Sequence, residues 1–208
     1  MNIQFRPADG DDAEAAIQLV YSSGPNAFDF VFNTDKNGMA IDFLRNAWLD
    51  GAGEFGYRNH TVGTLDGRVV VVGGGWSGKT GVSYMVAGAR QIIAQYGLWC
   101  GMQVIVRGLR TESVIPPPSA QHFYLGHLGV VPELQGQGIG QLLIRHLLDL
   151  GKAQGYTIAE LDVAVTNTRG QALYERLGFH VMQERKSGLR NRYGCVADHR
   201  KMQLRLTT

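Results

Sequence analysis

The sequence predicts a single mixed α/β domain, and three observations support this prediction. The chain has 208 residues, enough for one sizeable core but few for two. Stretches with strand and helix patterns follow one another along its length, without an internal repeat or a low-complexity segment. In the second half a strand, a glycine-rich loop and a helix stand in direct succession. We therefore expect one domain over residues 1–208.

The composition indicates a globular protein of balanced charge. Hydrophobic residues make up 44% of the chain and charged residues 18%, which is ordinary for a folded domain. The net charge is +2 without a run of like charges, so nucleic acid is not an expected partner. No stretch approaches the ~20 apolar residues of a membrane span, and no basic and then apolar leader follows Met1. Cys100 and Cys195 match no zinc spacing and suit a reducing compartment. These features predict a cytoplasmic protein with no membrane partner.

The first predicted elements are a strand and a helix. Residues Asn2 to Arg6 have the pattern of a short strand, which Pro7 ends. Asp11 and Asp12 then supply the acceptors and negative charge that favour a helix start. We expect that helix to run from Ala13 to Tyr21.

An aromatic segment, a predicted helix and a predicted hairpin come next. An aromatic segment, Phe28 to Phe32, follows a break rich in Ser, Gly and Pro. Met39 to Leu49 has the apolar spacing of an amphipathic helix. Thr61 to Leu65 and Arg68 to Val72 flank Asp66-Gly67, which is a strong signal for a tight turn. The last two segments therefore predict an antiparallel strand pair.

The segment from about residue 84 to residue 120 is treated as an insertion in the domain. Val86 to Tyr96 has a helical pattern, Val104 to Val106 fits either a strand or a buried helix, and Pro116 to Pro118 form a stiff connector. The segment is too apolar for a disordered linker. We expect its apolar side chains to bury against the sheet, against a partner subunit in a homodimer, or against a ligand.

The second half predicts four strands and two helices. Each strand is a short apolar or alternating stretch, and each helix has apolar spacing and a glycine at or beyond its end. The predicted strands are His122 to Val131, Thr157 to Val165, Phe179 to Gln183 and Met202 to Leu206. The predicted helices are Leu142 to Leu150 and Gln171 to Leu177.

A glycine-rich loop, Gln135-Gly136-Gln137-Gly138-Ile139-Gly140, stands between the predicted strand at 122–131 and the helix at 142–150. Glycines let consecutive backbone N–H groups converge, and the start of a helix adds a partial positive charge of about 0.5. Together these features bind a pyrophosphate. A tight structural turn explains such a loop about equally often, so the loop alone does not define a function.

Two sequence blocks resemble the GNAT superfamily of N-acetyltransferases. Gln135, Gly138 and Gly140 fit the family motif [QR]xxGx[GA], and Val130-Val131-Pro132-Glu133 precede it as in the family. Residues Asn167 to Phe179 are similar to the family block Asn-x-x-[AG]-x-x-Leu-Tyr-x-x-Leu-Gly-Phe, at the usual distance downstream.

The resemblance covers roughly residues 121–187 and implies both a fold and a cofactor. The fold would have a central, mostly antiparallel sheet, flanked by helices and splayed at the strands beside the glycine loop. The cofactor would be acetyl-CoA as co-substrate, entering the split in the sheet, without a metal. The residues that the resemblance assigns to acetyl-CoA are Leu128, Gly129, Val130, Gln135, Gly136, Gln137, Gly138, Ile139, Gly140 and Asn167. For Asn167, a helix-capping role explains the residue about as well.

The implied activity is direct transfer of an acetyl group to a primary amine. A backbone N–H near Leu128 to Val130 would face the oxygen on which negative charge develops. Tyr174 stands where the family often places the tyrosine that protonates the leaving thiolate, although packing of a half-buried ring is the alternative. The acceptor is an amine-bearing small molecule, a peptide or a protein. We expect the 84–120 segment to shape the acceptor site, where Arg107 and Arg110 either meet an acceptor carboxylate or stay solvated.

A base is also required, because an ammonium with a pKa of about 10.4 must lose its proton at a cost of ~4–5 kcal/mol. His122 is the predicted catalytic base, since it lies about where some family members place a glutamate. His127 is a weaker candidate, and a satisfied strand histidine is the alternative for both. A bulge that the family carries in this strand makes side-chain alternation unsafe. Glu54 and Glu112 are further candidates with no motif.

Two other functions compete with this prediction. Gly73 to Thr80 fulfil the GxxxxGK[ST] pattern of a P-loop nucleotide-binding protein, with Lys79 as the phosphate ligand. Against it, the preceding strand is one arm of a hairpin, whereas a P-loop strand normally lies in a parallel sheet. A dinucleotide-binding fingerprint fails because Gln141 stands where Gly or Ala is needed. A non-catalytic acyl-CoA-binding module on the same fold is the other alternative.

Overall fold

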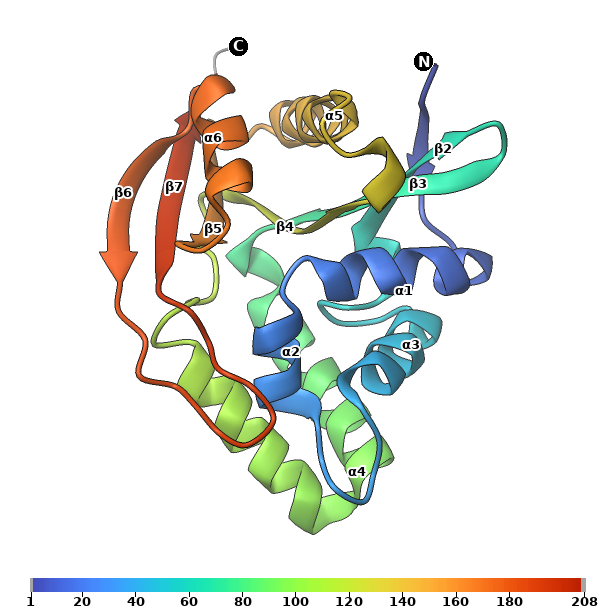
Figure 1. The fold of residues 1–208 in the computed structure, drawn as a ribbon, viewed down its shortest axis with the longest axis vertical. Helices are drawn as coiled ribbons and strands as arrows, with labels where there is room; N and C mark the ends of the chain where they lie inside the picture. The colour runs from blue at the N-terminus through green and yellow to red at the C-terminus, as the bar shows by residue number, and fades with distance from the viewer. Residues whose placement is uncertain (1, 207–208) are drawn as a thin grey trace.

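The structure is a computed structural model that describes residues 2–206, and its centre is a twisted sheet of seven strands (Figure 1). The strand order is β1-β2-β3-β4-β5-β7-β6, and every pairing is antiparallel except that of β4 with β5. The strands are β1 (Gln4–Pro7), β2 (His60–Leu65), β3 (Arg68–Trp76), β4 (Phe123–Val130), β5 (Ile158–Ala164), β6 (His180–Arg185) and β7 (His199–Arg205). The predicted mixed α/β class with a mostly antiparallel sheet is confirmed.

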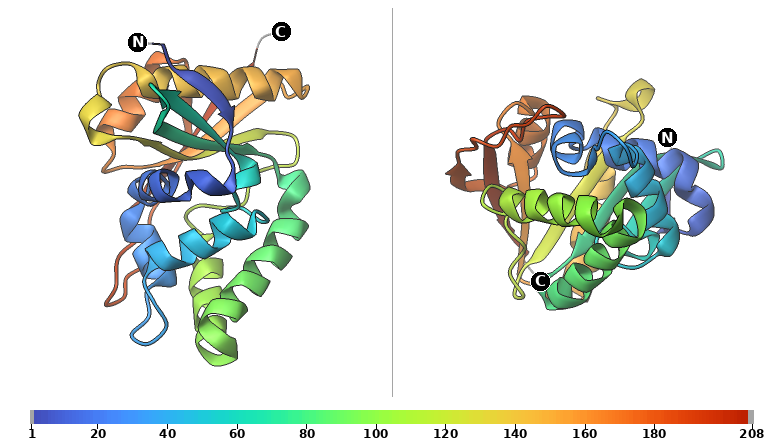
Figure 2. Two further views of the ribbon diagram at one scale, coloured as in Figure 1. Left: turned by 90° about the vertical axis from the view of Figure 1, so that its right-hand side faces the viewer. Right: turned by 90° about the horizontal axis from the view of Figure 1, so that it is seen from below.

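Helices cover both faces of the sheet (Figures 1 and 2). They are α1 (Ala13–Ser22), α2 (Pro25–Phe32), α3 (Ala40–Asp50), α4 (Gly81–Thr111), α5 (Ile139–Ala153) and α6 (Thr168–Arg176). The first four lie on one face and enclose a core that includes Phe30, Phe43 and Trp48. The last two lie on the other face, where α5 buries Leu143 and Leu147 against the sheet. No helix within residues 2–206 has the length and apolar character needed to cross a bilayer.

Two predicted segments differ from the structure. The aromatic segment is a helix, α2, and it begins at Pro25, within the stretch that was predicted to be a break. Proline is well tolerated in the first turn of a helix because its missing N–H has no partner there. The segment Val104 to Val106 is helical and belongs to α4, which spans 31 residues with a kink at Gly97. The positive φ of 71° at Gly97 is a conformation that glycine adopts without strain.

The P-loop pattern is not a phosphate-binding loop in the structure. Gly73 to Trp76 lie inside β3, where they pair with β2 on one side and β4 on the other. The missing side chains make room for neighbours, because a Cβ on Gly75 would overlap the Phe123 ring. Lys79 instead lies over the Tyr156 ring, 5.1 Å from its centre. The nucleotide-binding alternative therefore loses its structural basis.

The sheet opens between its two parallel strands. β4 and β5 pair only at Phe123 with Ala159 and at Tyr124 with Glu160. Beyond this point β4 continues to Val130 and β5 continues to Ala164, but the two strands no longer pair with each other. We call this opening the β4–β5 split. It exposes backbone groups on one edge of a central strand, which a closed sheet would satisfy internally.

Candidate active site

The edge of β4 presents backbone donors to the split. The Val131 N–H donates to the Val70 carbonyl on β3. Because successive residues of a strand turn their polar groups to opposite sides, Val130 and Leu128 direct theirs toward β5. The Gln135 side chain donates to the Val130 carbonyl at 3.2 Å, which agrees with this orientation. By the same alternation Gly129 faces β3, and a Cβ built on it would overlap the Leu19 carbonyl oxygen of α1.

The glycine loop leads directly from β4 to the start of α5. Gly136 and Gly138 have φ angles of 79° and 86°, a left-handed conformation that costs glycine little. Gly138 is the N-cap of α5 and supplies no side-chain cap. The first N–H groups of α5 therefore point out of the helix at its positive end. A Cβ built on Gly138 would meet nothing within 4 Å, so this helix start is open.

The first turn of α6 lies opposite the loop. The Asn167 side chain caps α6 by accepting a hydrogen bond from the Gly170 N–H at 2.9 Å. The exposed Arg169 brings its guanidinium to 3.7 Å from a Cβ built on Gly136. A Cβ on Gly140 would touch Leu173 at 3.5 Å. A positive side chain therefore joins the open helix start, and Arg169 was not among the residues predicted from sequence for this site.

Tyr174 lies on α6 and packs into the core between α5 and the sheet. Its ring meets Phe179 edge-on with the centres 6.1 Å apart. Burial raises the pKa of Tyr174 to about 12, so the hydroxyl keeps its proton at neutral pH. No hydrogen-bond partner for this hydroxyl is present among residues 2–206. The Tyr174 hydroxyl, the predicted acid, is thus protonated and has no competing hydrogen bond to a described residue. The ring of the same residue also packs in the core.

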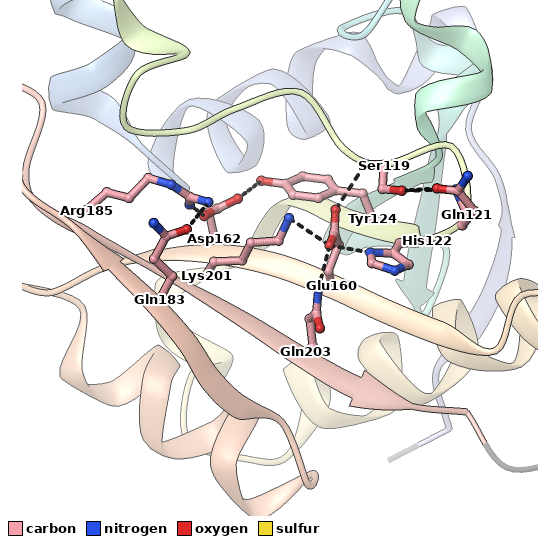
Figure 3. Close-up of polar contacts among 10 residues, drawn as sticks. All are labelled: Ser119, Gln121, His122, Tyr124, Glu160, Asp162, Gln183, Arg185, Lys201 and Gln203. Carbon is pink, nitrogen blue, oxygen red and sulfur yellow. Dashed lines mark hydrogen bonds and ion pairs between the residues drawn. The ribbon is translucent and has the colours of Figure 1, made fainter.

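His122 directly precedes β4 and joins a charged cluster at the closed end of the split (Figure 3). Its Nδ1 lies 2.7 Å from Glu160, whose side chain is fully buried. The same carboxylate accepts hydrogen bonds from Lys201 at 2.9 Å and Gln203 at 3.1 Å. Burial alone would raise the pKa of Glu160, but these bonds outweigh it and lower the pKa. Glu160 is therefore ionised, and it holds the His122 ring in place.

A second pair, Tyr124 and Asp162, lies where the strands diverge (Figure 3). The Tyr124 hydroxyl donates to Asp162 at 3.4 Å, and Arg185 donates to the same carboxylate at 3.2 Å. Burial raises the pKa of Asp162 to about 6 despite the opposing charges of Arg185 and Lys201. Burial also raises the pKa of Tyr124, with a further contribution from Asp162. Sequence reasoning missed this pair, because only the pairing of β4 with β5 places the two side chains on one face.

A third cluster lies around the bulge of β4 and joins residues that the sequence left unconnected. His127 has a positive φ of 56° and interrupts the register of β4 with β3. It contacts His60 of β2 and approaches Glu54 of the loop after α3. The bulge confirms that simple alternation was unsafe in this strand. Sequence reasoning named His127 and Glu54 separately and assigned His60 no role.

The remaining candidates lie outside these clusters. Glu112 is the exposed C-cap of α4 and makes no ion pair with any described residue. Arg107 donates to the carbonyl oxygens of Phe30 and Asn33, and these hydrogen bonds tie α4 to the end of α2. Tyr84 of α4 lies beside Trp76, with ring centres 6.4 Å apart. Within residues 2–206, no three His, Cys, Asp or Glu side chains are grouped to hold a metal ion.

The split sheet with an open, glycine-capped helix start beside it defines a protein with the GNAT fold. The model of the acetyltransferase (GNAT) family matches residues 101–179 of the chain. The resemblance predicted from sequence is thus confirmed. An N-acetyltransferase from Staphylococcus aureus Mu50 superposes with a TM-score of 0.69 at 17% identity, covering 97% of this chain and 100% of that one.

Other comparisons agree on the fold. The Escherichia coli ribosomal-protein-S18-alanine N-acetyltransferase superposes with a TM-score of 0.56 at 16% identity, covering 100% of this chain and 96% of that one. A Salmonella typhimurium protein solved with its cofactor acetyl-CoA superposes with a TM-score of 0.55 at 16% identity, with the same coverage. At such identities these likenesses show the fold alone.

Similarity in sequence is confined to part of each relative. The [ribosomal protein bS18]-alanine N-acetyltransferase of Salmonella typhimurium is 35% identical over 75 residues, which are 36% of this chain and 48% of that protein. Mycothiol acetyltransferase of Beutenbergia cavernae is 40% identical over 65 residues, which are 31% of this chain and 21% of that protein. The chain thus spans about half of the first relative and about a fifth of the second.

Proposed function

We propose that this protein is an acyl-CoA-dependent N-acetyltransferase that moves an acetyl group from acetyl-CoA to a primary amine by direct attack. The observation that carries the proposal is the open start of α5 at Gly138, which lies beside the unpaired edge of β4. Relatives named as N-acetyltransferases and a neighbour solved with acetyl-CoA support it. The alternative of a non-catalytic acyl-CoA-binding module shares the site and differs only in the chemistry.

The residues present fit the phosphates and the pantetheine arm of acetyl-CoA. The loop from Gln135 to Gly140 offers N–H groups at the positive end of α5, and Arg169 adds a full positive charge. The Leu128 and Val130 groups offer strand-like hydrogen bonds to an amide-bearing arm in the split. Asn167 would contribute its side-chain nitrogen, since its oxygen already caps α6.

Acetyl-CoA, when bound, supplies an acetyl group activated as a thioester. Backbone N–H groups of β4 would stabilise the negative charge that develops on the carbonyl oxygen. The Tyr174 hydroxyl would give its proton to the departing sulfur, because it is protonated and has no other partner. A histidine imidazole would take the proton of the amine. The two candidates are His122, just before β4, and His127, within β4.

We propose that the acceptor binds on the α1–α4 side of the sheet. The helices α5 and α6, which would hold acetyl-CoA, lie on the other face of the sheet. The amine would therefore reach the split from the face that α1 to α4 cover. Tyr84, from the segment predicted to shape the acceptor site, reaches Trp76 on this side. Burial raises the pKa of Tyr84, and the nearby Glu54 carboxylate raises it further. The acceptor is a small molecule, a peptide or a protein that bears an amine.

The test of the binding site compares two glycines at opposite ends of α5. Gly138→Glu places bulk and negative charge at the helix start, and we expect it to abolish acetyl-CoA binding in calorimetry. Gly155→Glu is the matched control, because Gly155 has a φ of 82° and equally open surroundings beyond the end of α5. Wild type and control should gain ~2.7 kcal/mol of stability at ligand concentrations 100 times the dissociation constant. Equal binding by both variants would refute the site.

The activity is tested with radiolabelled acetyl-CoA. The acceptor panel contains an aliphatic diamine, an amino acid, an aminoglycoside, a peptide with a free N-terminus and a lysine-rich protein. Transfer to an amine supports the enzyme, whereas tight acetyl-CoA binding without transfer to any member favours the non-catalytic module. A nucleotide-induced stabilisation that Lys79→Ala removes would contradict the whole assignment and favour the P-loop alternative.

A further inference from the structure

Two histidines and a glutamate form a continuous chain of contacts on the α1–α4 side of β4. His60 Nδ1 lies 2.9 Å from the Gly56 carbonyl oxygen. His60 Nε2 lies 3.0 Å from His127 Nδ1. His127 Nε2 lies 3.4 Å from Glu54 Oε1. The His127 side chain is 9% exposed and that of Glu54 is 45% exposed, so the chain runs from the interior to solvent.

The hydrogen-bonding groups determine which nitrogen of each ring carries a proton. The Gly56 carbonyl can only accept, so His60 Nδ1 is the donor. Burial, together with the positive charge that His127 can carry, lowers the pKa of His60 to about 3, so this ring is neutral at neutral pH. Its Nε2 is therefore an acceptor, and His127 Nδ1 must donate to it. The remaining ring nitrogen, His127 Nε2, faces Glu54, so a proton taken up there lies beside the carboxylate.

His127 belongs to β4, the strand that borders the split, and directly precedes Leu128. His127 forms the bulge of the strand, in a left-handed conformation that is uncommon for a side chain other than glycine. Strained residues of this kind cluster at functional sites. The next residue, Leu128, directs its N–H toward the split, as the alternation from Val131 shows. Base and oxyanion donor would thus come from adjacent residues.

Aromatic rings pack around the His127 side chain. Phe55 stacks on it with ring centres 5.0 Å apart, and Trp76 and Phe28 lie at 5.2 Å and 6.2 Å. Among residues 2–206, the titratable side chains in polar contact with the ring are Glu54 and His60. An imidazolium formed at His127 would therefore be stabilised by one carboxylate and held in one orientation.

We infer that His127 Nε2 is the proton acceptor for the amine, with Glu54 stabilising the imidazolium and His60 as a positioning residue. This inference rests on the proposed function. The ammonium gives one proton to His127, and the free amine attacks the thioester carbonyl carbon. The C–N bond forms, the C–S bond breaks, and the sulfur takes a proton from Tyr174. The second amine proton leaves to solvent or restores Tyr174, and His127 releases its proton past Glu54.

His122 is less well placed for this role. It lies before the pair Tyr124–Glu160, so the closed part of the sheet separates it from the split. Its carboxylate partner is shared with Lys201 and Gln203 in a buried cluster. A structural charge network around Glu160 is therefore enough to account for His122, and no role in the reaction is needed to explain it.

The first test reads the tautomers without turnover. Long-range ¹H–¹⁵N spectra of the protein alone at neutral pH should show His60 with its proton on Nδ1 and a bare Nε2. His127 should carry a proton on Nδ1. A His60 ring protonated on Nε2 would break the chain of donors and overturn the inference.

The second test is the pH profile of kcat/KM with the fastest acceptor of the amine panel. His127→Gln should lower kcat/KM about 100-fold or more, the scale of general-base catalysis, while acetyl-CoA binding and the melting temperature stay close to wild type. The remaining rate should rise with pH, because only the free amine reacts. Glu54→Gln should shift the acid limb of the profile to lower pH, since the imidazolium loses its carboxylate. His180→Gln, at an exposed position on β6, is the control that keeps the wild-type profile.

The outcomes separate this inference from the proposed function. A wild-type protein that acetylates no amine refutes the function itself. An active wild type whose acid limb survives in His127→Gln but is lost in His122→Gln refutes only the inference and assigns the base to His122. If His127→Gln fails to fold, the shift in Glu54→Gln decides, and an unshifted acid limb overturns the role of His127.

Discussion

Replacing Asp162 by Asn should change how stability depends on pH, because this carboxyl is buried where β4 and β5 diverge. Its side chain is 2% exposed, and Arg185 is its ion-pair partner at 3.2 Å. Burial raises its pKa from an ordinary 3.8 to about 6. Between these two values the folded protein holds the proton that the unfolded chain releases. Unfolding free energy therefore falls as pH rises through this window, and the contribution is fully present only below the unfolded value.

The size of the effect follows from the shift in pKa. A difference of about 2 units corresponds to ~3 kcal/mol in total, of which ~2 kcal/mol falls between pH 4 and pH 7. The Asn variant keeps the shape of the side chain but cannot titrate. The difference in unfolding free energy, wild type minus Asp162→Asn, should thus decrease by ~2 kcal/mol from pH 4 to pH 7. All other titrating groups cancel in this difference to first order.

Urea denaturation of both proteins at half-unit steps from pH 4 to pH 7 measures the difference directly. Asp149→Asn is the matched control, because its carboxylate is 75% exposed on α5 and its removal should matter little at any pH. A difference for Asp162→Asn that stays constant within ~0.5 kcal/mol over this range would show that burial does not perturb the carboxyl as argued.

Other substitutions probe the same regions. Tyr174→Phe keeps the ring packing but removes the hydroxyl, so kcat should fall ~10–100-fold in steady-state kinetics with little change in the KM for acetyl-CoA; an unchanged kcat leaves Tyr174 a packing role. Lys201→Met removes one partner of the fully buried Glu160, and urea denaturation should show a loss of ~3 kcal/mol; a loss below ~1 kcal/mol would mean that His122 and Gln203 suffice. Gly129→Ala puts a Cβ against the Leu19 carbonyl, and we expect ~1–3 kcal/mol of destabilisation by the same measurement; a neutral effect would contradict the close packing of α1 on β4.

The parts of the fold with strong local signals were predictable from the sequence. The Asp66-Gly67 turn specifies the β2–β3 hairpin, because both residues adopt a positive φ that suits this pair. The strand, glycine loop and helix at β4 and α5 were predicted because local chain chemistry determines each of them. α4 was predicted only in part, since its five glycines weaken the helical pattern. It is stabilised by packing against α2 and α3, which a local pattern does not contain.

The candidate site divides in the same way. The sequence by itself determined the anion-binding loop from Gln135 to Gly140 and the position of Tyr174, because a loop and a helix start depend on residues a few positions apart. Only the tertiary structure determined which side chains lie together around the proposed reaction site. His60 and His127 are 67 positions apart, and they meet because β2, β3 and β4 pair in order and a bulge turns His127 toward His60. Contacts of this kind depend on strand register and on burial, and both are properties of the assembled sheet.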